Sequence, residues 1–120
     1  MRRDWQEMRS ERREGRAGGA GMFNCTHVLE PGDSKLGVEF IHDNILDAGC
    51  TFAAHKHDVS EEIYYVLDGY GTLILDDETY PLSPGSVSVV RAGHSHGIEN
   101  NSGAPLRLIV IGAKAQAAES

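Results

Sequence analysis

Two histidines separated by one residue, His55 and His57, are the first residues in this 120-residue chain whose types and spacing could do chemistry. In a β-strand, residues two apart project from the same face, about 7 Å apart at the backbone. Two imidazoles in that arrangement can converge on one metal ion. The spacing alone is weak support, because core and surface histidines also occur in this way, and an ordinary structural role stays open for the pair.

A glutamate and a second histidine pair strengthen the metal-binding interpretation. Glu62 begins a segment, residues 62–67, whose other residues are typical of a buried strand. A carboxylate there must stay at the surface or meet a cation, since burial of the charge alone is costly. His94 and His96 follow a later predicted strand. Imidazoles with one carboxylate suit divalent manganese, iron, cobalt, nickel, copper or zinc, so the sequence predicts one bound transition metal of unspecified identity.

The order and spacing of these residues resemble the two motifs of the cupin superfamily. The first motif reads Gly, five residues, His-X-His, three or four residues, Glu, six residues and Gly. The chain fills its fixed positions with Gly49, His55, His57, Glu62 and Gly69. The second motif is matched by Gly85, Gly93, His96 and Asn100, with Arg91 where the family usually has proline. The chain therefore resembles a small single-domain metal-binding cupin of the conserved-barrel type.

That resemblance implies a fold and a ligand set. The fold is all-β, a double-stranded β-helix (jelly-roll) barrel, and the implied metal ligands are His55, His57, Glu62 and His96. Catalytic residues are not implied. Because Glu62 would be a ligand, a proton would have to move through another group, and His94 and Tyr64 are the candidates. His94, two residues before His96, is interpreted mainly as a rim residue.

The resemblance also implies a range of functions. We expect an enzyme that acts on a small oxygen-rich molecule as a dioxygenase, decarboxylase, lyase or sugar isomerase, through metal-bound dioxygen or Lewis-acid chemistry. The alternative is a non-catalytic module that binds a small carbohydrate or carboxylate, because the cupin fold hosts many functions. The expected partner is a small molecule in either case.

The rest of the chain supplies the strands that must position these residues. From residue 22 on, short β-branched, aromatic and aliphatic runs alternate with turn residues, which is typical of a sandwich or barrel. The clearest predicted strands are 38–41, 51–54, 63–67, 72–75, 86–90 and 106–111. Asp76 and Asp77 are predicted to close a hairpin between residues 72–75 and 79–82. We place the barrel at residues 22–113 and a C-terminal tail at 114–120.

Residues 1–21 differ from the barrel and are predicted to form a polar, Arg- and Gly-rich, flexible extension. Its charged stretch could form a short solvated helix, and four glycines between residues 15 and 21 break the pattern that follows. We expect its removal to change metal content and thermal stability little.

Charge and cysteine content exclude some partners. The extension carries six arginines against four acids, a net +2, whereas residues 22–120 carry five basic residues against fourteen acids, a net −9. An acidic body repels nucleic acid and anionic membranes, so we expect neither as a partner.

Cys25 and Cys50 are too few for a disulfide framework, and no apolar segment follows Arg2 and Arg3. The expected location is the cytoplasm.

One strand is apolar on both faces. Ile63, Tyr65 and Leu67 would form an outward-facing patch if the barrel were monomeric, and patches of that kind commonly mark interfaces. We therefore expect a homodimer joined largely through sheet faces or edges, with N-terminal strands contributing. A covering segment from the chain's own N-terminus is the competing explanation, and it would leave a monomer.

Overall fold

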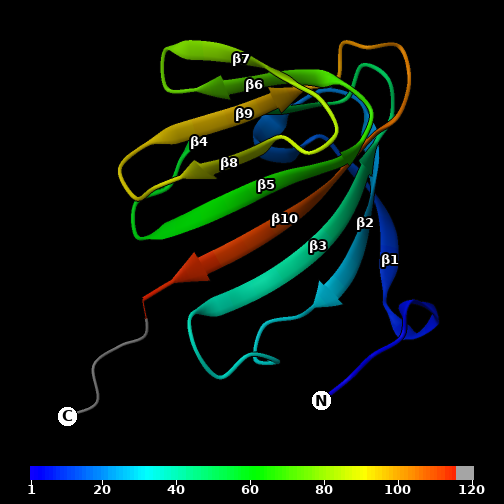
Figure 1. Ribbon diagram of the computed structural model, residues 1–120, viewed down its shortest axis with the longest axis vertical. Coiled ribbons are helices and arrows are strands. Elements are labelled where there is room, and N and C mark those ends of the chain that lie inside the picture. Colours follow the sequence, from blue (N-terminus) through cyan, green and yellow to red (C-terminus); the bar gives the residue numbers. More distant parts are fainter. Residues whose placement is uncertain (116–120) are drawn as a thin grey trace.

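Two antiparallel sheets form the fold of residues 1–115, which are the residues that the computed structural model describes. The strands are β1 (Ser10–Glu14), β2 (Met22–Leu29), β3 (Val38–Leu46), β4 (Thr51–Lys56), β5 (Ser60–Asp68), β6 (Gly71–Leu75), β7 (Glu78–Leu82), β8 (Val87–Val90), β9 (Ser95–Glu99) and β10 (Leu106–Lys114). Two short 3-10 helices precede β2, namely η1 (Trp5–Glu7) and η2 (Arg16–Gly18). The larger sheet has the order β1-β2-β3-β10-β5-β8 and the smaller one β4-β9-β6-β7 (Figure 1).

Alternation along the strands separates the core from the outer surface. In β10, Leu106, Leu108 and Val110 are fully buried, whereas the residues between them are exposed or half-buried. Because successive side chains of a strand point to opposite faces, the even positions of β10 fill the space between the two sheets. The same parity buries Tyr64 and Val66 of β5. The prediction of an all-β jelly-roll barrel is confirmed.

Turn residues stand where the sequence analysis expected them. Leu75 of β6 pairs with Glu78 of β7, so Asp76 and Asp77 close the hairpin between these strands. Asp76 has a φ of 52°, a left-handed conformation that Asp tolerates better than most residues. Gly69 has a φ of 90°, and a Cβ there would lie within 2.4 Å of the Pro105 carbonyl oxygen, so only glycine fits this corner.

The N-terminal segment, residues 1–21, contains a strand that the sequence analysis did not expect. Residues 10–14 form β1, which pairs with β2 in antiparallel register from Ser10 opposite Thr26 to Glu14 opposite Met22. Figure 1 shows β1 at one edge of the larger sheet. A strand of five polar residues, SERRE, carries no hydrophobic alternation, so the pairing depends on the tertiary contact with β2 rather than on a local pattern.

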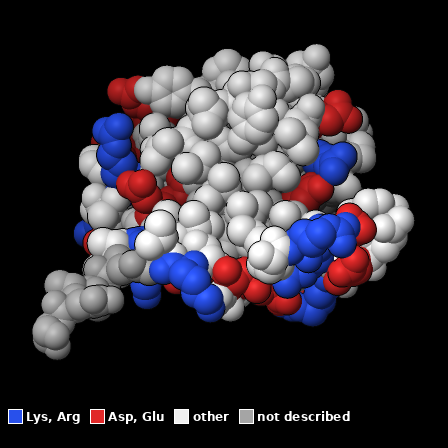
Figure 2. Space-filling view, turned by 60° about the horizontal axis from the view of Figure 1, so that its bottom comes forward, with Lys and Arg blue, Asp and Glu red and all other residues white. Residues whose placement is uncertain are grey.

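Ion pairs accompany this pairing. Arg3, Arg9 and Arg12 lie within 2.8 Å of carboxylate oxygens of Asp33, Glu30 and Asp47 respectively. Basic and acidic side chains accordingly lie next to one another along the lower part of Figure 2. Three of the six arginines of the segment are therefore paired with acids of the barrel.

The outer face of the larger sheet carries apolar residues on the side away from β1. Tyr65 and Val87, which are opposite each other in β5 and β8, are 44% and 64% exposed. Ile63 and Val89 form the next pair. No helix within residues 1–115 is long and apolar enough to cross a membrane. β10 extends to Lys114, and residues 116–120 of the predicted C-terminal tail lie outside the described residues.

Candidate metal centre

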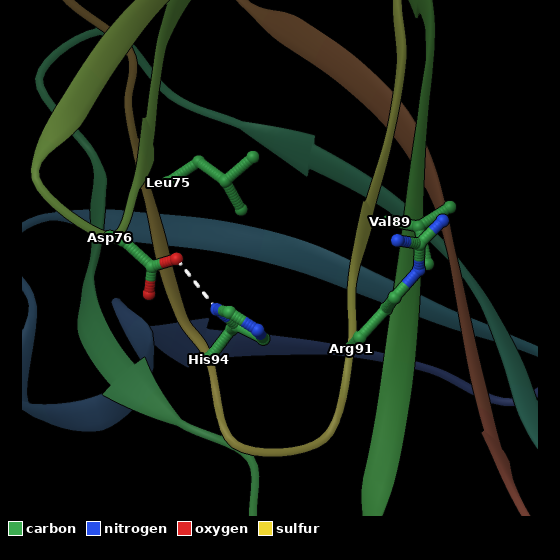
Figure 3. Close-up of a pocket in the computed structure, with 5 residues that line it drawn as sticks. All are labelled: Leu75, Asp76, Val89, Arg91 and His94. Atoms are coloured by element: carbon green, nitrogen blue, oxygen red, sulfur yellow. Dashed lines mark hydrogen bonds and ion pairs between the residues drawn. The ribbon is translucent and has the colours of Figure 1, made fainter.

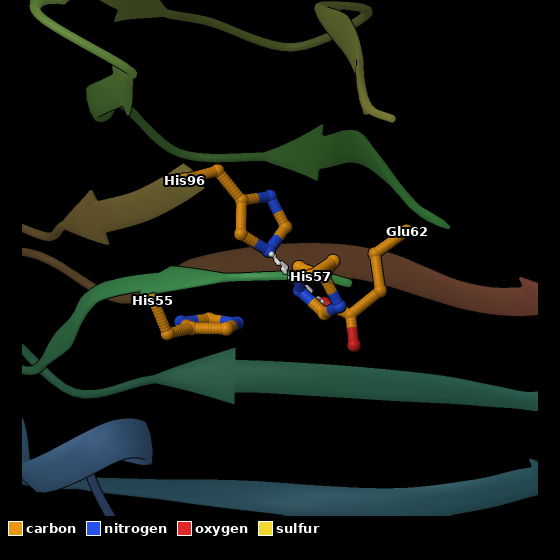
Figure 4. A group of neighbouring side chains, drawn as sticks. All are labelled: His55, His57, Glu62 and His96. Carbon is orange, nitrogen blue, oxygen red and sulfur yellow. Dashed lines mark hydrogen bonds and ion pairs between the residues drawn. The ribbon is translucent and has the colours of Figure 1, made fainter. Parts of the chain in front are cut away.

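Three strands bring the four implied ligands together at one point inside the barrel. His55 and His57 lie in and just after β4, Glu62 near the start of β5, and His96 in β9. One potential ligand atom from each side chain lies within 4.8 Å of the others, and Figure 4 shows the four side chains pointing toward one another. We call this group the ligand cluster. The sheet pairing explains the convergence, because His55 is directly opposite His96.

Hydrogen bonds on the outer side of two rings direct their other nitrogens inward. His55 Nδ1 lies 2.9 Å from the carbonyl oxygen of Ala53, which can only accept, so Nδ1 carries the proton and Nε2 keeps its lone pair. His57 Nδ1 lies 3.2 Å from Ser60 Oγ, which can accept in the same way. His96 differs, because its Nδ1 is buried without a hydrogen-bond partner in residues 1–115. Outer hydrogen bonds of this kind orient the ligating imidazoles of metal sites.

The charge states in the cluster also match those of metal ligands. Burial lowers the pKa of His96 below its usual value and outweighs the opposing effect of Glu62. Burial of Glu62 opposes its ionisation, but its contact and electrostatic interaction with His96, and then its interaction with His57, lower its pKa. We therefore assign a neutral His96 and an ionised Glu62, which are the forms that bind metal ions.

The distances between these atoms fit one metal ion. Glu62 Oε1 lies 3.1 Å from His96 Nε2 and 3.6 Å from His57 Nε2, and the two Nε2 atoms are 3.2 Å apart. Adjacent ligands on one ion, with metal–nitrogen bonds of about 2.0–2.1 Å, lie about 3 Å apart. Lone pairs aimed at one another over such distances repel unless a proton or a cation lies between them. The cluster could thus hold a metal ion.

The ligand cluster opens into a cavity of about 500 Å³. One wall consists of His55, His57 and Glu62, and we call it the ligand wall. The remaining lining residues are Phe40 and His42 of β3 together with residues 13–17 of the N-terminal segment, and we call them the N-terminal wall. A small molecule in this cavity would touch both walls.

Arg16 is one of the charged residues of the N-terminal wall. Its guanidinium carbon lies 5.9 Å, 6.0 Å and 5.7 Å from the ring centroids of Phe23, Phe40 and Phe52. Its Nη2 donates a hydrogen bond of 2.7 Å to His42 Nδ1. Cation–π contacts and this hydrogen bond hold the guanidinium in place.

Two glycines fix the backbone on either side of Arg16. A Cβ on Gly15 or Gly19 would lie 2.2 Å or 1.9 Å from the carbonyl oxygen of Thr51 at the start of β4. Ala20 completes this contact, because its carbonyl accepts from the Thr51 amide at 2.8 Å and its amide donates to Thr51 Oγ1 at 2.8 Å. The N-terminal wall is therefore joined to the strand that carries His55.

A second group with metal-binding residue types lies behind this wall. Cys25, His27 and His42 are all buried and have potential ligand atoms within 4.8 Å of one another. His42 Nδ1 accepts the hydrogen bond from Arg16, so its Nε2 carries the proton and has no free lone pair. Burial, and then the charge of Arg16, lower the pKa of His42 to about 4. The group does not suit a cation next to this guanidinium.

The two candidate catalytic residues lie in different places. Tyr64 stacks on the His96 ring with centroids 4.3 Å apart, and its hydroxyl lies 3.2 Å from His96 Nε2. His94 is instead exposed and lies 2.7 Å from Asp76 Oδ2, in a separate pocket that Arg91 also lines (Figure 3). The structure thus brings Tyr64 to the ligand cluster and not His94.

Sequence reasoning missed Arg16 and His42 as residues of the cavity. Arg16 was interpreted as part of a flexible extension and His42 as an ordinary histidine. The spacing of Gly15 and Gly19 around an arginine was the available signal, but glycines indicate a flexible linker as readily as close backbone contact.

Comparison with protein families gives one match. The family described as the cupin domain matches residues 44–112, more than half of the chain, and the matched region contains the whole ligand cluster. A protein of Methanocaldococcus jannaschii, described as uncharacterized, is 33% identical over 82 residues, which are 68% of this chain and 66% of that protein. The match thus spans just under two thirds of the archaeal relative.

Three comparisons cover more of the chain. An oxalate-binding protein of Thermotoga maritima is 29% identical over 105 residues, which are 88% of this chain and 87% of that protein. The crystal structure of a predicted oxalate decarboxylase from Thermotoga maritima superposes with a TM-score of 0.88 and 27% identity, over 95% of this chain and 99% of that one. A sugar phosphate isomerase from Silicibacter pomeroyi, with a TM-score of 0.74, 22% identity and coverage of 93% and 74%, shares the fold.

Proposed function

The chain belongs to the cupin domain family, and on that premise we propose that it binds one divalent transition metal and is an enzyme acting on a small oxygen-rich molecule. The observation that carries this proposal is the convergence of three imidazoles and one carboxylate at the inner end of an open cavity. We propose His55, His57, Glu62 and His96 as the metal ligands.

Small carboxylic acids are the first substrate class to test. The similarity to a protein named for binding oxalate, over most of both chains, supports this choice. A divalent metal at the ligand cluster would supply Lewis-acid chemistry toward carboxylate and carbonyl oxygens, or would bind dioxygen. The imidazoles and the carboxylate of the ligand cluster would face the ion. The side of the ion toward the cavity would stay open to the substrate.

Tyr64 is the residue that we propose as a hydrogen-bond donor near the reaction centre. Burial is the largest cause that raises its pKa above the ordinary value, and the charge of Glu62 adds to it. The phenol therefore keeps its proton at neutral pH and acts as a hydrogen-bond donor beside His96. His94 lies in a different pocket, so we propose no proton transfer from it to the substrate in the cavity.

Metal analysis followed by turnover assays tests this function. The protein purified from its own host is analysed for manganese, iron, cobalt, nickel, copper and zinc. Oxygen uptake and carbon dioxide release are then measured with oxalate and related acids. About one metal per chain with substrate-dependent uptake or release is the expected result. A metal content near zero contradicts the proposal.

A non-catalytic binding module is the second candidate, and the name of the oxalate-binding relative favours it. In that case calorimetry would detect binding of a small acid to the metal-loaded protein while the acid stays unchanged after prolonged incubation. The same site residues serve both functions, so turnover is what separates them.

We also propose that the chain forms a homodimer through the exposed apolar face of β5, β8 and β10. Residues 1–21 pair at the β1 edge, whereas β8 forms the opposite edge of the same sheet. The chain's own N-terminal segment therefore leaves this face uncovered. Burial of Tyr65 and Val87 against a second copy would stabilise the dimer.

Sedimentation equilibrium at micromolar concentration tests the dimer. We expect twice the 13.0 kDa chain mass for the unmodified protein and a monomer for Val87→Glu. A single-chain mass for both proteins contradicts the interface.

Because both cysteines are free thiols, we propose that the protein works in a reducing compartment such as the cytoplasm.

A further inference from the structure

Arg16 differs from the other arginines of the N-terminal segment in having no acidic partner. Arg2, Arg3, Arg9, Arg12 and Arg13 each lie within 4.0 Å of a carboxylate oxygen. In the described part of the chain, Arg16 makes no ion pair, although its side chain is only partly exposed. A guanidinium removed from water without a counter-charge is unfavourable.

The hydrogen-bonding capacity of Arg16 is also largely unused. A guanidinium has five N–H donors, and the bond to His42 uses one of them. Its Nε is buried and has no hydrogen-bond partner within residues 1–115. Contacts with three phenylalanine rings and the hydrogen bond to His42 restrict the position of the guanidinium before any ligand arrives.

The position of this guanidinium relates it to the ligand cluster. Arg16 lines the same cavity as His55, His57 and Glu62. A ligand with oxygen atoms at both ends could therefore touch the metal and the guanidinium together.

We propose that Arg16 anchors a carboxylate of the ligand, so that the site selects small dicarboxylates. This inference rests on the proposed metal-binding function and adds the residue that determines ligand class. A planar guanidinium binds a carboxylate through two parallel hydrogen bonds. One carboxylate of the ligand faces the metal, and the other pairs with Arg16 and supplies the ion-pair partner that Arg16 lacks within residues 1–115.

Calorimetric titration of oxalate, malonate and succinate into the metal-loaded protein tests the anchor. The two carboxylates are separated by a different distance in each of the three acids. The acid that binds most tightly therefore also indicates the distance between the metal and the guanidinium. For Arg16→Gln we expect metal content equal to that of the unmodified protein and a Kd about 10- to 100-fold weaker for the best acid, because a charge-assisted hydrogen bond is lost.

Two further variants separate anchoring from a structural role. Arg16→Lys keeps the charge but not the two-pronged geometry, and we expect intermediate affinity. Arg12→Gln removes an exposed arginine of the same segment that pairs with Asp47 outside the cavity, and we expect unchanged affinity. If Arg16→Gln lowers the melting temperature, the Arg16→Lys variant carries the test.

The possible failures are distinguishable. Unchanged affinity in Arg16→Gln overturns the anchor. A metal-loaded protein that binds none of the three acids also overturns it, while the metal site stands. A chain that binds no metal overturns the proposed function. The three acids are then titrated into the metal-free protein, and the anchor predicts weaker binding in Arg16→Gln than in the unmodified protein. Equal binding, or no binding, in both proteins overturns the anchor as well.

Discussion

The two walls of the cavity are built in different ways. The ligand wall takes its residues from β4, the residue that follows it and β5, which adjoin in the sequence within residues 51–68. The N-terminal wall joins η2 to β3 and to the start of β4 across more than twenty residues of chain. Side chains that bind one metal ion must keep a fixed spacing, whereas side chains that line a cavity need only touch the bound molecule. The first kind of wall leaves a motif in the sequence, and the second does not.

Removal of a ligand should give the largest effect and would act on the ligand wall alone. His57→Ala deletes one of four proposed ligands, and we expect metal affinity to fall more than about 100-fold, beyond what loss of an outer hydrogen bond costs. The barrel should stay folded, because its stability comes mainly from apolar strands. Elemental analysis after dialysis measures the loss.

His94→Ala is the matched control for that variant. His94 is exposed and lies in a separate pocket, so its removal should leave metal content unchanged. Full metal occupancy in His57→Ala would show that the ligand assignment is wrong.

Deletion of residues 1–21 should give the next largest effect and would act on the N-terminal wall. The deletion removes the β1–β2 pairing and uncovers Phe23 and Phe52, which are at most 1% exposed. We expect the melting temperature to fall by more than about 10 °C, or roughly 2 kcal/mol, with metal content retained. This reverses the expectation from the sequence, in which the segment was dispensable.

A shorter deletion sharpens the result. Removal of residues 1–8 takes away η1 but leaves β1 and Arg16 in place, so the melting temperature should fall less. Equal melting temperatures for the full chain and the chain without residues 1–21 would mean that the segment does not pack on the barrel in solution.

Acid should destabilise the N-terminal wall through His42. The pKa of His42 is lowered to about 4 in the folded chain, against about 6.5 in an unfolded one. Between these values the unfolded state binds the proton and the folded state does not, so stability falls as the pH falls from 6.5 to 4. Urea unfolding of the metal-free protein should lose about 2 kcal/mol between pH 7 and pH 4.5 through this group.

The variant His42→Gln isolates that contribution. Its amide oxygen can still accept from Arg16 but does not titrate, so its stability should decrease less over the same pH range. A pH dependence equal to that of the unmodified protein would contradict the assignment.

The smallest expected effect concerns the backbone next to Arg16. Ala17 has a φ of 56°, a left-handed conformation that glycine adopts more readily. Ala17→Gly should therefore raise stability by about 0.5–1 kcal/mol, measured by thermal unfolding. Gly19→Ala should act in the opposite sense, because its Cβ would lie 1.9 Å from the Thr51 carbonyl oxygen. A destabilised Ala17→Gly would contradict the described backbone.

These differences explain what the sequence could predict. The barrel and the convergence of the ligand cluster follow from alternating apolar strands and from side chains at fixed intervals. β1 could not be predicted, because its residues are polar and only the exposed edge of β2 makes them a strand. Arg16 could not be placed, because its neighbours Phe23, Phe40 and Phe52 come from three separate strands. Local patterns carry no information on such contacts.

The separation of the two walls along the chain has an evolutionary consequence. Residues 13–17 can change without altering any of the four ligand-cluster side chains, which come from elsewhere in the sequence. A duplicated copy of this chain could therefore acquire a new ligand preference through a few substitutions in this segment, while an inherited metal centre continued to function. Diversification of ligand preference in such a lineage would be recorded in residues 13–17.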